Sequence, residues 1–329
     1  MMCKVKTLGC LLALSVFFGC ADDEVEPVQD PSQFVASGFV TGLKLPVGMS
    51  MDEKGQLWVA ETGTGNNDAQ VSMVTPQGVV HTVITELNSV FANGSIEGMG
   101  HVLYKSGKLY ILNGNAGRLY IADVSSFKAG DAPVKASSLE SEDIRTFVHS
   151  LNLTDPINSN IYQLTFGPGD HLYLVDAGAN AIIKRDKDSK ALSLFAQIPN
   201  IAAGTEAVPT GIVFDGSKFL VSTLSGAPFI KGSSKIFQVD LAGSVSEYKI
   251  GFTTATDILL TANAKPLITE FAEFSFNPPG FVPATGRISK EDGTTLLGGL
   301  TMPTDLERSA DNVYYVLSYA EGTIQKLSY

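Results

Sequence analysis

Short apolar segments recur in pairs along the chain. The first members read LPVGMSM, SIEGMGH, NIYQLTF, VPTGIVF, TATDILL and MPTDLER, and the second members read QLWVAE, KLYILN, HLYLVD, KFLVST, KPLITE and NVYYVL. Aligning the first members gives one equivalent position, separated by 50, 65, 48, 46 and 48 residues and occupied by Gly48, Gly98, Gln163, Gly211, Asp257 and Asp305. A repeat of about 40–50 residues with several short strands is typical of a β-propeller blade.

The repeat predicts an all-β fold, a six-bladed β-propeller with four antiparallel strands in each blade. In the first blade we expect strands near residues 47–51, 57–61, 71–75 and 79–84, separated by turns rich in Gly, Pro and Asp. The last blade lacks a fourth strand, because the chain stops after GTIQKLS. The segment SGFVTGL at 37–43 precedes the first blade and has no blade of its own. We therefore expect this N-terminal strand to complete the last blade and close the ring.

The first 19 residues predict a signal peptide. Two lysines precede an apolar run at 7–19 that is too short to span a bilayer, and the run ends at Gly19-Cys20. This resembles a bacterial lipoprotein signal, with Cys20 as the lipidated residue; the alternative is a plain secretory peptide cut elsewhere. Residues 20–36 are acidic and contain two prolines, which predicts a flexible tether before a propeller at 37–329.

The leader and tether together predict export and lipid anchoring to the bacterial envelope. We expect the outer membrane, and surface display is a further hypothesis because an acidic run follows the cysteine. The chain carries a formal charge of −11, which repels phosphate backbones and disfavours nucleic acid as a partner. The three cysteines all lie within the first 20 residues, so the mature body has no thiol for disulfides, catalysis or metal binding.

Longer segments carry a resemblance to a known family. LPVGMSMDEKGQLWVAETGTG, NIYQLTFGPGDHLYLVDAGANAIIKRD and VPTGIVFDGSKFLVSTLSGAPFIKGSSKIFQVD are distinctive, and over residues 38–329 the chain resembles the ScyD/ScyE family. Single blades are also similar to NHL repeats. The resemblance implies a six-bladed propeller and no particular reaction.

The long insertions predict where binding occurs. In a propeller the D–A and B–C connections share one face, which we call the loop face, and the A–B and C–D turns share the other. The long connection at 125–160 and the segments LSGAPFIKGS and FAEFSFNPPGFVPATG all fall on the loop face. Around the mouth of the central channel we therefore expect a ligand site formed by Glu61, Glu97, Asn113, Tyr162, Asp176, Asp257, Glu270, Asp305, Phe229 and Phe274.

Asp257 and Asp305 are candidate metal ligands. They occupy the equivalent position in neighbouring blades, and Ca²⁺ prefers such hard oxygen ligands. A bound Ca²⁺ could polarise a lactone or ester carbonyl, by analogy with six-bladed lactonases. Gluconolactonase-type propellers, however, carry Asn or Asp one residue earlier, where only Glu97 is anionic here. The competing interpretation is structural, because a short acid at a strand start often accepts backbone N–H groups.

Phenylalanines are concentrated in the two B–C insertions of the loop face, at positions 229, 271, 274, 276 and 281. Aromatic side chains on proline-stiffened loops suit a hydrophobic or planar ligand, or a protein partner. They could equally pack on each other to hold the loops. The sequence therefore favours a binding or scaffolding module for a small hydrophobic or aromatic ligand or an envelope protein. The alternative is a Ca²⁺-dependent lactonase or esterase.

Overall fold

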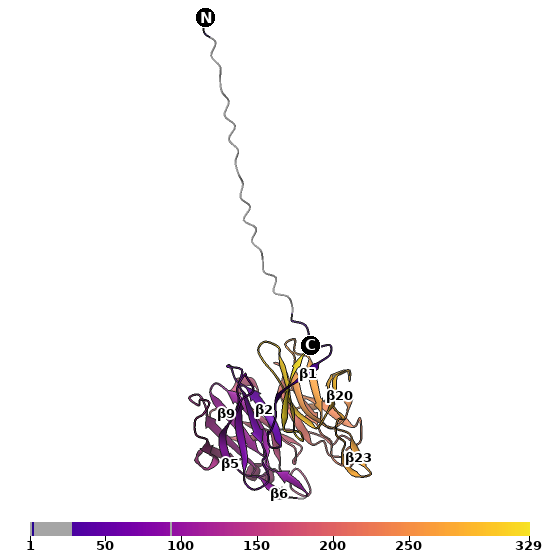
Figure 1. Ribbon diagram of the computed structural model, residues 1–329. Helices are drawn as coiled ribbons and strands as arrows, with labels where there is room; N and C mark the ends of the chain where they lie inside the picture. Colours follow the sequence, from indigo (N-terminus) through magenta and orange to yellow (C-terminus); the bar gives the residue numbers. More distant parts are fainter. Residues whose placement is uncertain (1, 3–27, 93) are drawn as a thin grey trace.

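The computed structural model describes residues 2, 28–92 and 94–329 (Figure 1). Its six small sheets are arranged in a ring around one central channel. In each sheet successive strands pair from the innermost outwards, as expected for propeller blades. Each innermost strand contacts the innermost strand of the next blade, and the last contacts the first. The predicted six-bladed β-propeller is therefore confirmed.

The strands of the first three blades follow the predicted order. Blade one contains β2 (Pro46–Met51), β3 (Leu57–Glu61), β4 (Ala69–Val74) and β5 (Val80–Leu87). Blade two contains β8 (Met99–Lys105), β9 (Lys108–Asn113), β10 (Arg118–Asp123) and β12 (Glu140–Asp143). Blade three contains β13 (Ile161–Phe166), β14 (Leu172–Asp176), β15 (Ala181–Arg185) and β16 (Leu192–Gln197).

The other three blades repeat this arrangement. Blade four contains β17 (Pro209–Phe214), β18 (Phe219–Thr223), β19 (Ser234–Val239) and β20 (Val245–Phe252). Blade five contains β21 (Ala255–Leu260), β22 (Pro266–Glu270), β25 (Gly286–Lys290) and β26 (Thr295–Leu300). Blade six contains β27 (Pro303–Arg308), β28 (Tyr314–Ser318), β29 (Thr323–Ser328) and, as its outermost strand, β1 (Val35–Val40).

The two ends of the chain close the ring. β1 pairs antiparallel with β29, with Val35 opposite Ser328 and Val40 opposite Ile324. The expected closing strand is therefore confirmed, although it spans 35–40 instead of 37–43. Phe34, just before it, is 2% exposed and its ring lies 5.0 Å from that of Tyr314. Figure 1 shows β1 beside the C-terminus.

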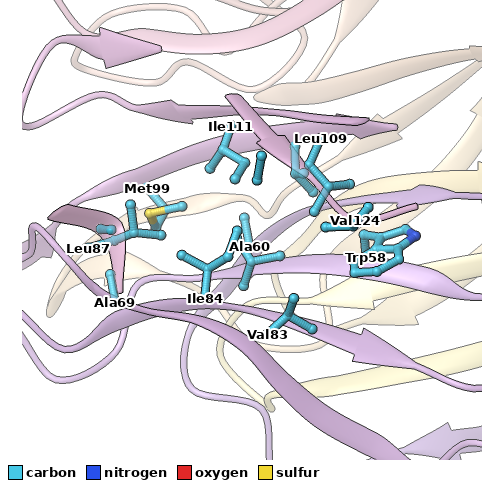
Figure 2. Packing of buried hydrophobic residues seen from close by; sticks show 14 of the residues in the cluster. Trp58, Ala60, Ala69, Val83, Ile84, Leu87, Met99, Leu109, Ile111 and Val124 are labelled. Carbon is cyan, nitrogen blue, oxygen red and sulfur yellow. The ribbon is translucent and has the colours of Figure 1, made fainter. Parts of the chain in front are cut away.

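The hydrophobic core lies between neighbouring blades. One cluster joins blade one to blade two, where Trp58, Ala60 and Ile84 face Leu109 and Ile111 (Figure 2). Side chains that point to one side of a strand pack on the next blade, because alternate residues of a strand face opposite ways. Packing of every blade on its two neighbours explains why ring closure matters for stability.

Four connections contain structure of their own. β12 divides the segment at 125–160, so the prediction that all of it lies on the loop face was wrong. The part before β12 is the C–D connection of blade two, which begins on the opposite face beside the A–B turn and contains β11 (Val134–Lys135), paired in parallel with β5, and a 3₁₀ turn at Ala136–Ser138. The part after β12 is a D–A connection on the loop face and contains α1 (Arg145–Leu151). Hairpin β6 (Val90–Ala92) and β7 (Ser95–Glu97) precedes blade two, and hairpin β23 (Phe274–Phe276) and β24 (Pro279–Phe281) lies within blade five. In Figure 1 the β6 and β23 labels lie at the edge of the ring opposite β1. No helix within the described ranges is long and apolar enough to cross a membrane.

The strand register corrects one alignment. The equivalent residues of the inner strands lie opposite Ala60, Val175, Ser222, Thr269 and Leu317. In blade two Met99 pairs with Asn113 and Val102 with Ile111, so the residue opposite Leu112 is His101. The assignment of Gly98 to this position was wrong by three residues. Its cause is the β6–β7 hairpin, whose second strand continues the apolar pattern up to the start of β8.

Candidate functional site

A cavity of about 440 Å³ lies over the channel on the loop face, and we call it the loop-face cavity. Its lining residues are Ser95, Ile96, Glu97, Asn160, Tyr162, Ala177, Val208, Thr210, Leu224, Thr256, Phe271, Phe281, Met302 and Tyr319. An adjoining cavity of about 170 Å³ adds residues of blades one and six, including Val47, Thr62 and Thr304. Tyr162, Thr210 and Thr256 each directly precede the equivalent position of an inner strand, so the cavity lies at the channel mouth.

The loop-face cavity is mainly apolar and aromatic. Phe271 contacts Phe281 at 5.0 Å between ring centroids and Tyr319 at 6.5 Å, which makes a continuous aromatic wall. Tyr162 contributes a further ring from blade three. Glu97 is the one charged residue among those lining the two cavities. A concave apolar site with few polar groups is the usual form of a small-molecule site.

The structure brings Glu97 and Tyr162 together in this cavity, but it places the two predicted loop phenylalanines behind its wall. The rings of Phe229 and Phe274 each lie 5.2 Å from that of Phe281, which faces the cavity. The rings also lie 5.2 Å from each other. The two B–C loops therefore hold each other in place through aromatic packing, as the competing interpretation expected.

Sequence reasoning missed Tyr319, Leu224 and Ala177 in the cavity wall. Each directly follows the end of a second strand, as do Phe271 and Thr62, so all five occupy one equivalent position. That position points to the channel mouth because the B–C connections begin there. Listing it blade by blade would have identified these residues from the repeat alone.

Four of the predicted site residues end second strands and are buried, with exposed fractions of 0–2%: Glu61, Asn113, Asp176 and Glu270. Each bonds to the connection that enters its own blade. Glu61 accepts the Lys44 N–H at 2.7 Å, and Glu270 accepts the Thr253 N–H at 2.7 Å. Asp176 accepts the N–H of Asn160, and Asn113 donates to the carbonyl of Asn88, both at 2.7 Å. These groups position the loops around the cavity, because their hydrogen bonds fix the connections to the blades.

A polar network fills the channel below the cavity. His101, Gln163, Asp257 and Asp305 occupy the equivalent position in four blades, and each is at most 9% exposed. Gln163 donates from Nε2 to Asp257 Oδ1 at 2.7 Å and lies 3.2 Å from His101 Nδ1. The rings of His101 and Tyr162 are 5.0 Å apart, so the Tyr162 ring lies between His101 of the network and the loop-face cavity.

The network also joins neighbouring blades. Asp305 Oδ2 accepts the Met49 N–H of blade one at 2.5 Å, and Asp257 Oδ2 accepts the Leu306 N–H of blade six at 3.1 Å. Gln163 Oε1 accepts the Ile212 N–H of blade four at 2.5 Å. In each case the side chain bonds the residue after the equivalent position in a blade further along the ring. This is the structural role expected for a short acid at a strand start.

Burial disfavours the charged forms of the side chains in the network. Burial raises the pKa of Asp257. Burial also raises the pKa of Asp305, and the negative charges of Asp257 and Glu307 raise it further. Burial also lowers the pKa of His101 to about 3, so this imidazole is neutral at pH 7. Its Nε2 has no partner among the described residues.

The channel carboxylates do not fit a Ca²⁺ site. Ca²⁺ requires six to eight oxygen ligands, whereas amide N–H groups already occupy both oxygens of Asp257 and Oδ2 of Asp305. In residues 28–92 and 94–329 there is no group of three or more His, Cys, Asp or Glu arranged to hold a metal. The predicted metal role of Asp257 and Asp305 therefore has no support in the geometry.

Solved structures with the same architecture support the fold. Streptogramin B lyase matches 90% of this chain and 97% of its own, with 15% identity and a TM-score of 0.57. A protein assigned as a gluconolactonase matches 91% and 93%, with 11% identity and a TM-score of 0.57. A Bacteroides thetaiotaomicron protein of unknown function matches 90% and 76%, with 12% identity and a TM-score of 0.61. No protein-family model and no curated protein sequence matches the chain.

The fold is a six-bladed β-propeller. At such low identity the likeness extends to the fold and not to the activity, because propellers with unrelated functions share one architecture. The function has to be argued from the cavity and the channel of this chain.

Proposed function

We propose that this protein is a binding module that takes a small hydrophobic or aromatic ligand into its loop-face cavity. The observation that carries the proposal is the size and lining of that cavity: about 440 Å³ bounded by aromatic and aliphatic side chains at the channel mouth. An apolar ligand gains free energy by leaving water for such a surface. The loops that form the wall are anchored by buried hydrogen bonds, which limits the ordering cost of binding.

We further propose that the protein is exported and anchored to the outer membrane through Cys20, and that it belongs with the ScyD/ScyE family. The leader and the cysteine lie outside the described residues. Asn263, in the A–B turn of blade five, donates from Nδ2 to the Val28 carbonyl at 2.8 Å. The chain therefore enters the propeller on the face opposite the loop face. A lipid anchor would leave the cavity directed away from the membrane, accessible to a ligand or an envelope partner.

Fluorescence of the neutral probe N-phenyl-1-naphthylamine tests the binding proposal, because its emission rises when it enters an apolar site. The purified protein should enhance the emission saturably. Leu224→Arg places a charge in the cavity wall and should abolish the enhancement. Ile230→Arg is the matched control, since Ile230 is 58% exposed on the same face outside the cavity. Equal enhancement by both variants and the wild type would place the probe elsewhere.

Anchoring has its own test, since it does not depend on the cavity. Cells expressing the wild type should incorporate labelled palmitate into the protein and retain it in the membrane fraction. Cys20→Ser should remove the label and release the protein. An unlabelled wild type would favour the plain secretory alternative, and a labelled Cys20→Ser protein would contradict Cys20 as the lipidated residue.

The hydrolase alternative has one observation in its favour. Enzymes share this fold, among them the streptogramin B lyase and a luciferin-regenerating enzyme with 10% identity and a TM-score of 0.56. A Ca²⁺-dependent lactonase or esterase predicts lactone turnover that Ca²⁺ supports, that a chelator removes and that Asp257→Asn abolishes. The occupied oxygens of Asp257 and Asp305 lead us to expect no turnover in any of these conditions.

A further inference from the structure

The charge of the loop-face cavity narrows the class of ligand. The residues that line the cavity and its smaller neighbour include one anion, Glu97, and no cation. Ser95 Oγ donates to Glu97 Oε1 at 2.7 Å. No described residue donates a hydrogen bond to the other carboxylate oxygen, and none forms an ion pair with Glu97. A free carboxylate oxygen thus remains for a donor on the ligand.

The fold holds Glu97 at this place. It ends β7, where it pairs with Val90 of β6, and the next residue begins the entry into blade two. The Gly98 carbonyl accepts the Asn115 N–H at 3.1 Å, which ties the end of the hairpin to blade two. A Cβ on Gly98 would lie 3.0 Å from the Asn88 carbonyl oxygen, so the backbone is closely packed there. The backbone on both sides of Glu97 is therefore fixed, by β6 and by blade two.

Aromatic rings line the same cavities as the Glu97 carboxylate. Tyr162, Phe271 and Tyr319 line both cavities together with Glu97. Burial raises the pKa of Tyr319, and the nearby negative charge of Glu97 raises it further. A cation among these rings would gain from their π faces in addition to the carboxylate. An anionic ligand would meet an unfavourable charge in a poorly solvated site.

We propose that the ligand is an aromatic or hydrophobic amine, bound with its ammonium group on Glu97 and its apolar part against Tyr162, Phe271 and Tyr319. This rests on the proposed function, because it assigns a chemical class to the ligand of the same cavity. A charge-assisted hydrogen bond from an ammonium to a partly buried carboxylate is stronger than a neutral one. Discrimination of about tenfold between an amine and its neutral isostere follows from that difference.

Calorimetric titration with three probes of one shape tests the proposal: 2-naphthylmethylamine, 2-naphthylmethanol and 2-naphthoate. The wild type should bind the amine about tenfold more tightly than the alcohol and should bind the naphthoate most weakly. Glu97→Gln should reduce the affinity for the amine to that for the alcohol and leave the alcohol unchanged. Glu273→Gln is the matched control, a loop-face carboxylate paired with Lys231 and outside both cavities.

The outcomes separate the two proposals. Equal affinities for amine and alcohol in the wild type, or a preference for the amine that persists in Glu97→Gln, would overturn the amine assignment and leave the cavity as a ligand site. Loss of the preference for the amine in Glu273→Gln would also overturn the amine assignment, because the amine would then be attracted by the overall negative charge of the surface. Failure of all three probes to bind would overturn the proposed function together with this inference.

Discussion

The carboxyl group of Glu307 gives the folded protein a dependence on pH that one substitution removes. Glu307 lies on β27 in the lower part of the channel and is only partly exposed, and its Oε1 accepts the Met51 N–H at 3.1 Å. Burial, more than the neighbouring charge of Asp257, raises its pKa from 4.5 to about 8. The folded state therefore binds this proton more tightly than the unfolded state does. The resulting stability is complete below pH 4.5 and is lost as the pH rises through 8.

The magnitude follows from the two pKa values. A carboxyl group that titrates at 4.5 when unfolded and near 8 when folded corresponds to a difference of about 5 kcal/mol in the free energy of unfolding. Glu307 is partly exposed at the end of the channel opposite the loop face, so water screens its charge. We therefore expect a difference of about 2 kcal/mol in the free energy of unfolding. Glu307→Gln keeps a carbonyl acceptor for Met51 and cannot ionise. Its stability relative to the wild type should therefore increase by about 2 kcal/mol from pH 5 to pH 9.

Urea unfolding of the wild type and Glu307→Gln at pH 5, 7 and 9 measures this difference directly. The pKa of His101 is lowered from 6.5 to about 3, so its contribution to stability rises with pH between these two values. Both proteins contain His101, so this contribution cancels in the difference between them. Glu321→Gln is the control, because Glu321 is exposed. A difference between Glu307→Gln and the wild type that stays constant or shrinks as the pH rises would refute the reasoning.

Three further predictions concern the fold. Arg287→Met leaves buried Glu270 without its two-bond ion pair and should lower the free energy of unfolding by about 3 kcal/mol. Adding Glu270→Gln should restore part of the loss. An Arg287→Met variant that is as stable as the wild type in urea would contradict this prediction. Gly48→Ala brings a methyl group within 2.5 Å of the channel histidine and should cost about 2 kcal/mol, whereas Gly38→Ala, with open space around it, should cost under 1 kcal/mol; equal urea midpoints would be the opposite result. Removal of residues 1–41 deletes the closing strand and should lower the melting temperature by about 10 °C in calorimetry; an unchanged melting temperature would mean that the ring closes without it.

Most of the fold could be predicted from the sequence repeat. Paired apolar segments at a near-constant spacing indicated six blades, and the missing strand of the last blade indicated how residues near 35–40 pair. Local pattern could not place His101, because the β6–β7 hairpin adds an apolar segment next to the inner strand. The spacing to the second strand does identify His101. In other blades nine residues separate the equivalent position from the start of the second strand, at Leu57, Leu172 or Tyr314. In blade two His101 precedes Leu109 by eight residues.

The candidate site was harder to predict than the fold. Polar residues at strand ends suggested a ligand site at the channel mouth. In the structure, residues such as Glu61 and Glu270 instead accept hydrogen bonds from the backbone of the neighbouring connections. Sequence alone shows that a carboxylate faces the mouth and not whether a backbone amide already occupies it. The wall of the cavity depends on how two loops pack on each other, as Phe281 and Phe229 do, and no single blade encodes that contact.

The central claim is that the loop-face cavity is the ligand site of this propeller. Crystals soaked with 2-naphthylmethanol, a neutral probe that does not depend on Glu97, test it most directly. We predict electron density for the naphthyl ring between Tyr162, Phe271 and Tyr319. Density for the probe at another surface, with the loop-face cavity holding only solvent, would contradict the claim.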